Sequence, residues 1–269
     1  MFFRWFEHGQ VYHPDKVLDA VETRRAEPFE DVYFKTPDGL SLNGWFFSPA
    51  ASNSAHKNRC LLLCHGNAGN ISHRVDLCRA LVALGLNVFQ FDYRGYGRSE
   101  GRPSEEGTYV DAVSATKWLQ NKGFNNRSII AFGESLGGAI AAELTLRMPL
   151  GGLVLQNTFT SIPDIGADLF PWMPVRMMAS IKYDTYSKLP RLDIPVMVIH
   201  SRGDDLAGFH HAERNFAAAN EPKLFWETQG GHGDLLLDRL HFREGMERFL
   251  GMMGAHKKAA AAAQVLENR

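Results

Sequence analysis

Short apolar runs alternate with segments of helical periodicity along most of this chain. The runs that indicate strands are CLLLCHG (60–66), NVFQFDY (87–93), SIIAFG (128–133), GLVLQN (152–157), VMVIHS (196–201) and KLFWET (223–228). The helical segments fall at 72–85, 108–123, 139–147, 210–220 and 238–250. Strands that alternate with helices predict an α/β fold, with a mainly parallel sheet, right-handed crossovers and helices on both faces.

Two stretches depart from this alternation. Residues 29 to 48 contain two strand-like runs around a Pro-Asp-Gly turn, which predicts a β-hairpin. Residues 158 to 193 separate two predicted strands with proline-punctuated helical fragments, which predicts a small helical lid at the carboxyl edge of the sheet. We therefore expect an N-terminal segment (1–28), an α/β domain that includes the lid (29–250) and a C-terminal tail (251–269).

The two ends of the chain differ in composition from the rest. The opening 14 residues are rich in aromatic side chains, but Arg4 and Glu7 interrupt them, and they lack the apolar core and cleavage site of a secretory signal. We expect this segment to pack on the body; an interfacial anchor or an element of the substrate mouth is the alternative. The closing KKAAAAAQVLENR has low complexity and no apolar periodicity, so we expect a disordered tail or a segment added for expression.

Composition and charge narrow the functional classes. The length of 269 residues suits one domain, because α/β folds often run to ~250 residues as a single unit. The 29 basic and 30 acidic residues are mixed along the chain and leave a net charge of −1, so we do not expect nucleic acid as a partner. No run reaches the ~18 consecutive apolar residues of a membrane span.

The cysteines are odd in number and indicate a reducing compartment. Cys60 and Cys64 lie in one strand-like run, where same-face positions four residues apart are roughly 13 Å from each other, too far to bridge. Together with Cys78 they are expected to be reduced core residues, which favours a cytoplasmic protein.

The stretch FGESLGG places Ser135 where a predicted strand gives way to a predicted helix. A serine hydroxyl is a weak nucleophile unless its geometry is fixed beside a base, and a sharp strand-to-helix turn holds it clear of the sheet. Gly133 and Gly137 suit such a turn, since a side chain at either position would crowd it. The pattern GxSxG alone is moderately specific, but this context predicts that Ser135 is a catalytic nucleophile.

Acyl transfer also needs donors for the developing oxyanion. One backbone N–H comes from the residue after the nucleophile and another from the loop after an earlier strand, which here is CHGNAGN (64–70). Leu136 and Asn67 are therefore the candidate donors. We expect His65 to shape this loop rather than to act as the base.

A general base and its acid must come from later loops at the same edge of the sheet. In this architecture the order is serine, acid, histidine. Asp204 follows the strand-like run 196–201 and is the favoured acid, with Asp205 and Asp164 as alternatives. His232 lies in the glycine-flanked loop QGGHGD after the last predicted strand and is the candidate base.

These blocks resemble the α/β-hydrolase superfamily, and within it the small-cap serine hydrolases of the abhydrolase-domain or serine-aminopeptidase-like group. The resemblance spans roughly residues 29 to 250 and rests on HGNAGN, FDYRGYGRSEGRPSEEG, FGESLGG, QNTFTSIPD, HSRGDD and GGHGD in that order. It implies an eight-stranded type of sheet, Ser135, Asp204 and His232 as the triad, and a structural role for FDYRGYGRS. One departure is LAG after the acid, where similar proteins often have an apolar pair and a proline.

The expected reaction is the hydrolysis of a carboxylic ester or thioester through an acyl-enzyme. Candidate substrate-binding residues in the lid are Phe159, Phe170, Trp172 and Met177, which suit an apolar acyl group, although these residues alternatively only bury the lid on the body. We expect no cofactor and no metal, because HExxH, paired CxxC and a complete GxGxxG are absent from the sequence. Alternatives are aminopeptidase or lysophospholipase activity, a noncatalytic binding protein of this fold, and a peripheral membrane protein that uses its aromatic N-terminus.

Overall fold

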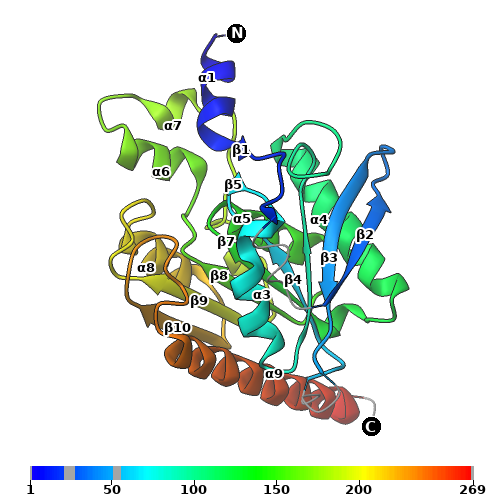
Figure 1. The fold of residues 1–269 in the computed structure, drawn as a ribbon. Helices are drawn as coiled ribbons and strands as arrows, with labels where there is room; N and C mark the ends of the chain where they lie inside the picture. The colour runs from blue at the N-terminus through cyan, green and yellow to red at the C-terminus, as the bar shows by residue number, and fades with distance from the viewer. Residues whose placement is uncertain (1, 21–27, 51–55, 268–269) are drawn as a thin grey trace.

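A central sheet organises the protein, whose computed structural model describes residues 2–20, 28–50 and 56–267 (Figure 1). In these residues the sheet has eight strands in the order β10-β9-β8-β7-β4-β6-β3-β2. Their bounds are β2 Phe29–Lys35, β3 Ser41–Phe47, β4 Cys60–Cys64, β6 Asn87–Phe91, β7 Ile129–Glu134, β8 Gly152–Gln156, β9 Val196–Ser201 and β10 Lys223–Thr228. Pairs are parallel except those that β3 makes with β2 and β6, so the predicted mainly parallel sheet is confirmed.

Helices cover both faces of this sheet, and strand β4 illustrates why. All five of its residues are buried. Cys60, Leu62 and Cys64 belong to one apolar cluster, whereas Leu61 and Leu63 belong to the other. Alternate side chains of a strand point to opposite faces, so a strand covered on both sides must be apolar throughout.

Each apolar cluster is completed by its own set of helices. The first contains side chains of α4 (Glu105–Asn121), α5 (Leu136–Arg147) and α8 (Phe209–Ala218). The second contains side chains of α3 (Val75–Val82) and α9 (Arg239–Glu267). The 3-10 turns η1 (Ile71–Arg74), η2 (Asn126–Ser128) and η3 (Leu189–Arg191) connect these elements.

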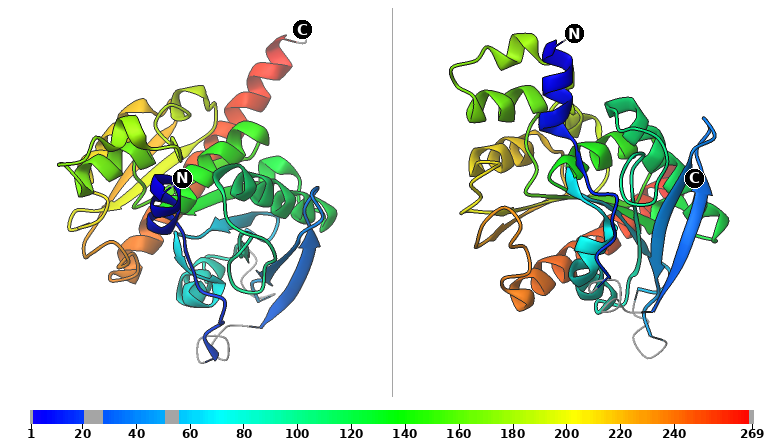
Figure 2. Two further views of the ribbon diagram at one scale, coloured as in Figure 1. Left: turned by 90° about the horizontal axis from the view of Figure 1, so that it is seen from above. Right: turned by 45° about the horizontal axis from the view of Figure 1, so that its top comes forward.

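The predicted hairpin and the predicted lid are both present. Strands β2 and β3 pair from Phe29 with Phe47 to Lys35 with Ser41. The lid contains α6 (Ile162–Leu169) and α7 (Val175–Met178), which lie beyond the carboxyl edge of the sheet (Figures 1 and 2).

The N-terminal segment forms a helix that packs beside the lid. Helix α1 (Phe2–Val11) lies next to α6 and α7 in each view (Figures 1 and 2). Its Glu7 carboxylate accepts hydrogen bonds from the backbone N–H groups of Ser180 and Ile181 at 2.7 and 2.9 Å. After the helix, β1 (His13–Pro14) pairs with β5 (Ala68–Gly69) in a second, two-stranded sheet that the sequence analysis did not predict.

The C-terminal tail is helical, which corrects the expectation of a disordered segment. Helix α9 continues through the alanine-rich sequence to Glu267. Alanine has the most favourable helix propensity, so a polyalanine run extends an existing helix even without apolar periodicity. The final two residues of the predicted tail lie outside the described residues.

Candidate active site

Ser135 occupies a strained turn between β7 and α5. Its backbone has φ 51° and ψ −116°, a conformation that non-glycine residues rarely adopt. The turn is held in place because the Ser135 N–H donates to the Gln156 carbonyl at the end of the neighbouring β8. The side chain is largely buried but lines the large cavity beneath the lid.

The glycines around Ser135 permit this turn. A Cβ on Gly137 would overlap the backbone of Cys64 in β4, and a Cβ on Gly133 would overlap the backbone of Gly138. These two positions match the crowding expected from the sequence. Gly138 is a third such position, since a Cβ there would overlap the Thr158 side chain after β8.

Asp204 and His232 are brought together by loops that follow β9 and β10. The Nδ1 of His232 lies 2.7 Å from Asp204 Oδ2. The other Asp204 oxygen accepts from the backbone N–H groups of Leu206 and Ala207 at 2.9 and 2.8 Å. The LAG sequence after the acid therefore supplies the donors that fix this carboxylate.

The environment of Asp204 favours its charged form. Burial on its own raises the pKa of this carboxyl, but the hydrogen bonds from His232, Ala207 and Leu206 outweigh burial and leave the pKa below its ordinary value. Neither alternative acid contacts His232 in this way. Asp205 is exposed, and Asp164 binds Thr160 and Arg176.

Asn157 links the loops that carry His232 and Asp204, a contact that the sequence analysis missed. It follows β8 with a φ of 46°, and its side-chain amide donates to the His232 carbonyl at 2.6 Å. Its side-chain oxygen accepts from the Ser201 N–H at 2.9 Å, next to the loop that carries Asp204. The block QNTFTSIPD contained the signal, an amide side chain at a strand end, but gave no partner for it.

In this conformation of the described residues, no hydrogen bond joins Ser135 Oγ to the His232 ring. Catalytic hydrogen bonds are often long or poorly aligned without substrate and tighten in the substrate complex. The strand ends nevertheless connect the two residues, since Gln156 holds the Ser135 backbone and the adjacent Asn157 holds the His232 backbone.

The loop after β4 is clamped by the N-terminal segment. The Asn67 carbonyl accepts from the His13 N–H at 3.0 Å and from the Tyr96 hydroxyl at 2.8 Å. No hydrogen bond within the described part of the chain uses the Asn67 N–H. Leu136 is the first residue of α5, where backbone N–H groups have no intrahelical acceptor. Both residues line the same cavity as Ser135, as an oxyanion site requires.

The neighbouring loops act as supports. His65 is buried against the rings of Tyr93 and Tyr96, with its Nε2 3.4 Å from Asp92 Oδ1. Arg94 joins Asp111 at 2.8 Å. These contacts agree with the structural roles expected for His65 and for FDYRGYGRS.

An ion pair lies next to the Ser135 turn. Glu134, immediately before Ser135, pairs with Arg74 at 2.9 Å. Burial opposes ionisation of Glu134, but the charge and hydrogen bonds of Arg74 outweigh it, and the charges of His65 and His232 act in the same direction to lower its pKa. Sequence reasoning did not identify this pair.

The cavity has a volume of about 430 Å³ and a mostly apolar wall. Of the four lid residues predicted to bind substrate, Phe159 and Phe170 line it. Trp172 and Met177 do not, because they lie on the outer side of the lid with 77% and 88% of their surfaces exposed. The other lining residues come mainly from the lid and from the N-terminal segment, for which an element of the substrate mouth was the alternative expectation; those of the N-terminal segment are Phe6, Glu7, Gln10, Val11 and His13.

Donor atoms suited to a metal ion converge in one place among the described residues, at Asp168, His210 and His211. None of these three side chains lines the cavity.

Sequence comparisons identify the family. A model described as serine aminopeptidase, S33, matches residues 55–185. The chain is 31% identical over 236 residues to the alpha/beta hydrolase domain-containing protein WAV2 of Arabidopsis thaliana. The aligned region covers 80% of this chain and 76% of WAV2. The chain belongs to the α/β-hydrolase family. This hydrolase is also 41% identical over 223 residues to the uncharacterized protein Rv2307c of Mycobacterium tuberculosis, covering 82% of this chain and 78% of that protein.

Solved structures agree on the fold. An esterase from Pyrococcus furiosus superposes on the hydrolase with a TM-score of 0.72 at 18% identity, covering 90% of this chain and 97% of the esterase. This likeness confirms the predicted α/β-hydrolase fold. Within the described residues, no helix has the length and apolar character needed to cross a membrane.

Proposed function

We propose that this hydrolase cleaves carboxylic esters or thioesters through an acyl-enzyme, with Ser135 as the nucleophile. The observation that carries the proposal is the 2.7 Å contact between His232 Nδ1 and Asp204 Oδ2 at the edge of the sheet where the strained Ser135 turn faces an apolar cavity. A histidine oriented by a carboxylate can serve as base for a nearby hydroxyl.

The reaction follows from these roles. Ser135 Oγ attacks the substrate carbonyl while His232 takes its proton, and the resulting oxyanion is bound by the backbone N–H groups of Asn67 and Leu136. His232 then protonates the leaving group and the acyl-enzyme forms. Water, activated by the same imidazole, attacks this ester and releases the acid. Asp204 holds the imidazole tautomer and stabilises its charged form throughout.

The apolar cavity wall favours an acyl group as the part of the substrate that is bound. Glu7 is the acidic side chain among the described residues that line it. Its carboxylate already accepts hydrogen bonds from Ser180 and Ile181 and is therefore not available for a peptide amino terminus. We favour ester or thioester hydrolysis over aminopeptidase activity for this reason, although the matched family model carries the aminopeptidase description.

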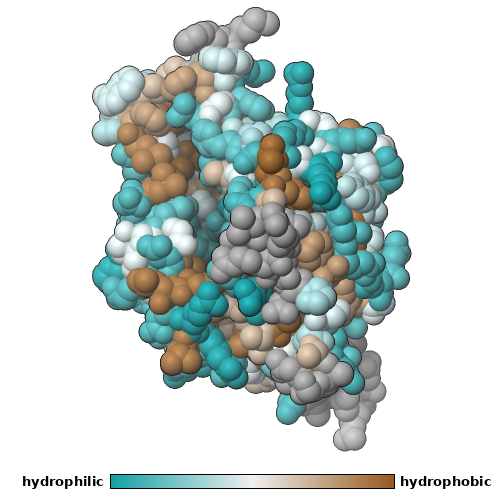
Figure 3. All heavy atoms as spheres, in the orientation of Figure 1, coloured by the Kyte–Doolittle hydropathy of each residue, from teal (hydrophilic) through white to brown (hydrophobic). Residues whose placement is uncertain are grey.

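A lipid-like substrate at a membrane surface is a second candidate. Apolar side chains are exposed on α1 and on the lid, at Trp5, Leu169, Trp172 and Met177, and Figure 3 shows apolar surface gathered over the lid. Exposed apolar patches mark interaction sites. Lysophospholipase activity with weak membrane contact would use this surface. Sedimentation with liposomes, with and without residues 1–14, tests this membrane contact. Partitioning that does not change after the deletion would refute it.

We further propose a cytoplasmic location, which rests on the three free, buried cysteines. The substrates we propose are small acyl compounds, with no role for nucleic acid and no cofactor.

Labelling with a fluorophosphonate probe tests the catalytic assignment. We expect labelling of the wild type and its loss in Ser135→Ala and His232→Ala. Matched controls are Ser187→Ala and His256→Ala, which alter residues outside the site and should label normally. Labelling of Ser135→Ala at the wild-type level would overturn the proposal. A protein that binds esters without labelling or turnover would instead be a noncatalytic member of the family. Turnover of p-nitrophenyl esters, acyl thioesters and aminoacyl amides then ranks the substrate classes.

A further inference from the structure

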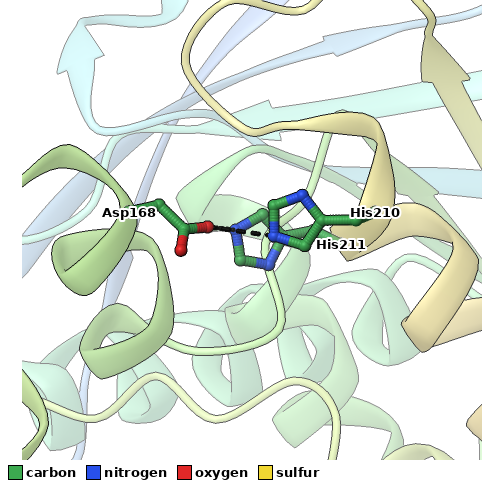
Figure 4. Close-up of side chains that lie close together, drawn as sticks. All are labelled: Asp168, His210 and His211. Carbon is green, nitrogen blue, oxygen red and sulfur yellow. Dashed lines mark ion pairs between the residues drawn. The ribbon is translucent and has the colours of Figure 1, made fainter. Parts of the chain in front are cut away.

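We propose that Asp168, His210 and His211 form a binding site for a divalent ion of the zinc type, which fastens the lid to the body of the hydrolase. Asp168 belongs to lid helix α6, and the two histidines belong to α8 on the body (Figure 4). One oxygen of Asp168 lies 3.0 Å from the Nε2 atoms of both histidines. Two imidazoles and one carboxylate are a ligand set that zinc accepts.

The spacing of these atoms suits coordination. Ligand bonds of ~2.0–2.1 Å in a tetrahedral site place neighbouring ligand atoms about 3.3 Å apart. The observed separations of 3.0 Å between the Asp168 oxygen and each Nε2 are close to this value. Asp168 and His210 are partly exposed, with 41% and 52% of their side-chain surfaces accessible, so a water molecule can complete the coordination.

The Nε2 atom of His211 lacks a satisfactory partner. It is buried and makes no hydrogen bond among the described residues, although the Asp168 oxygen is within 3.0 Å. A buried ring nitrogen without a hydrogen bond is costly. A metal ion placed between His211 and Asp168 would bind the His211 Nε2 and the Asp168 oxygen.

Thr160 and Asp164 provide the outer support that metal-binding histidines usually have. The His211 Nδ1 lies 2.9 Å from Thr160 Oγ1, and this hydroxyl lies 2.8 Å from Asp164 Oδ2. A proton on Nδ1 donates to Thr160 Oγ1, whose own proton goes to Asp164. This tautomer leaves the Nε2 lone pair for the ion. It gives up the longer contact from the Thr160 N–H to Nδ1, at 3.2 Å.

The charge state of the cluster also suits a cation. Asp164 is already neutralised by Arg176 and Arg214, whereas the basic partners of Asp168 among the described residues are these two histidines.

The site has a structural consequence for the cavity. Leu169 and Phe170, which directly follow Asp168, line the cavity wall. An ion that holds Asp168 against α8 would keep this wall in place and slow the opening of the lid. Control of substrate entry by the ion rests on the proposed function, whereas binding of the ion does not.

Calorimetric titration with zinc chloride tests the site on the full chain, freed of purification tags and of metal. We expect one zinc ion per chain, and at least ten-fold weaker binding in Asp168→Asn and in His210→Ala, both at partly exposed positions. His256→Ala is the matched control and should bind as the wild type does. Equal zinc affinity in the wild type and the Asp168→Asn/His210→Ala double variant would overturn the proposal.

Two further readouts separate this site from activity. Cobalt(II) bound in place of zinc should give the intense visible absorption of a tetrahedral site in the wild type and not in His210→Ala. Zinc should also slow hydrogen exchange of residues 162–169 in the wild type only. Loss of labelling by fluorophosphonate would refute the hydrolase mechanism but would leave these binding results unchanged, so the two proposals fail independently.

Discussion

The Glu7 carboxylate is the main polar link between α1 and the lid, and its removal should weaken the docking of these two segments on each other. Glu7 is 6% exposed and accepts hydrogen bonds from the Ser180 N–H, the Ile181 N–H and the Ser180 hydroxyl. A hydrogen bond to a charged group contributes ~1.5–3 kcal/mol, but Ser180 is exposed and water replaces part of the loss. We therefore expect Glu7→Ala to cost about 3 kcal/mol in the docking of these segments.

This cost predicts a local effect. At ~1.4 kcal/mol for each factor of ten, the equilibrium constant for undocking α1 should rise about 100-fold. Native-state hydrogen exchange followed by mass spectrometry measures it, because exchange through local opening follows that constant. Peptides from residues 2–11 and 175–181 should lose about two orders of magnitude of protection, whereas peptides from β4 and β7 should not change.

Two variants serve as controls. Glu7→Gln keeps a carbonyl oxygen for the two N–H donors and should lose only about 1 kcal/mol, the net contribution of an ordinary hydrogen bond. Arg4→Ala changes an exposed side chain on the same helix and should leave protection unchanged. The reasoning is refuted if Glu7→Ala retains wild-type protection in both segments, or if protection falls equally throughout the sheet.

Other substitutions test the site and the cavity. Asp204→Asn should lower kcat by about 10⁴, because the amide favours the wrong imidazole tautomer. The folded-state pKa of the Asp204 carboxyl is lowered, so the stability that its charge contributes is present above the ordinary pKa of ~3.9 and is lost as the pH falls through the lower folded-state pKa. The urea midpoints of the wild type and Asp204→Asn should therefore differ at pH 7 and approach each other as the pH falls below ~3.9. Gly138→Ala should reduce the urea midpoint and the activity, because the added Cβ overlaps the Thr158 side chain. Adding Thr158→Ala to this variant should restore part of both, and no recovery in the double variant would contradict this account. Phe170→Ala should shift the preferred chain length of p-nitrophenyl esters towards longer acyl groups, whereas Met177→Ala should not; equal shifts would place both residues in the acyl site.

The sequence by itself determined the layers of this protein and the chain positions where its chemistry would lie. Continuous apolar runs such as 60–64 can be satisfied only when both faces of a strand are covered, and alternating helices then require a parallel sheet. The motif around Ser135 was equally local, since the glycines and the serine of one turn are neighbours in the chain. The same local reasoning failed at the C-terminal tail, where helix propensity outweighed the lack of apolar periodicity.

Only the tertiary structure decided which distant groups meet. His232 and Asp204 are 28 residues apart, and their contact depends on β9 and β10 lying side by side. Helix α1 joins the cavity through a buried glutamate whose hydrogen-bond donors lie 173 and 174 positions away, and Trp172 lies outside the cavity although it is in the lid. Periodicity reports which face of an element is apolar, but the packing of one element against another is fixed by interactions between residues far apart in the chain, and no local pattern records them.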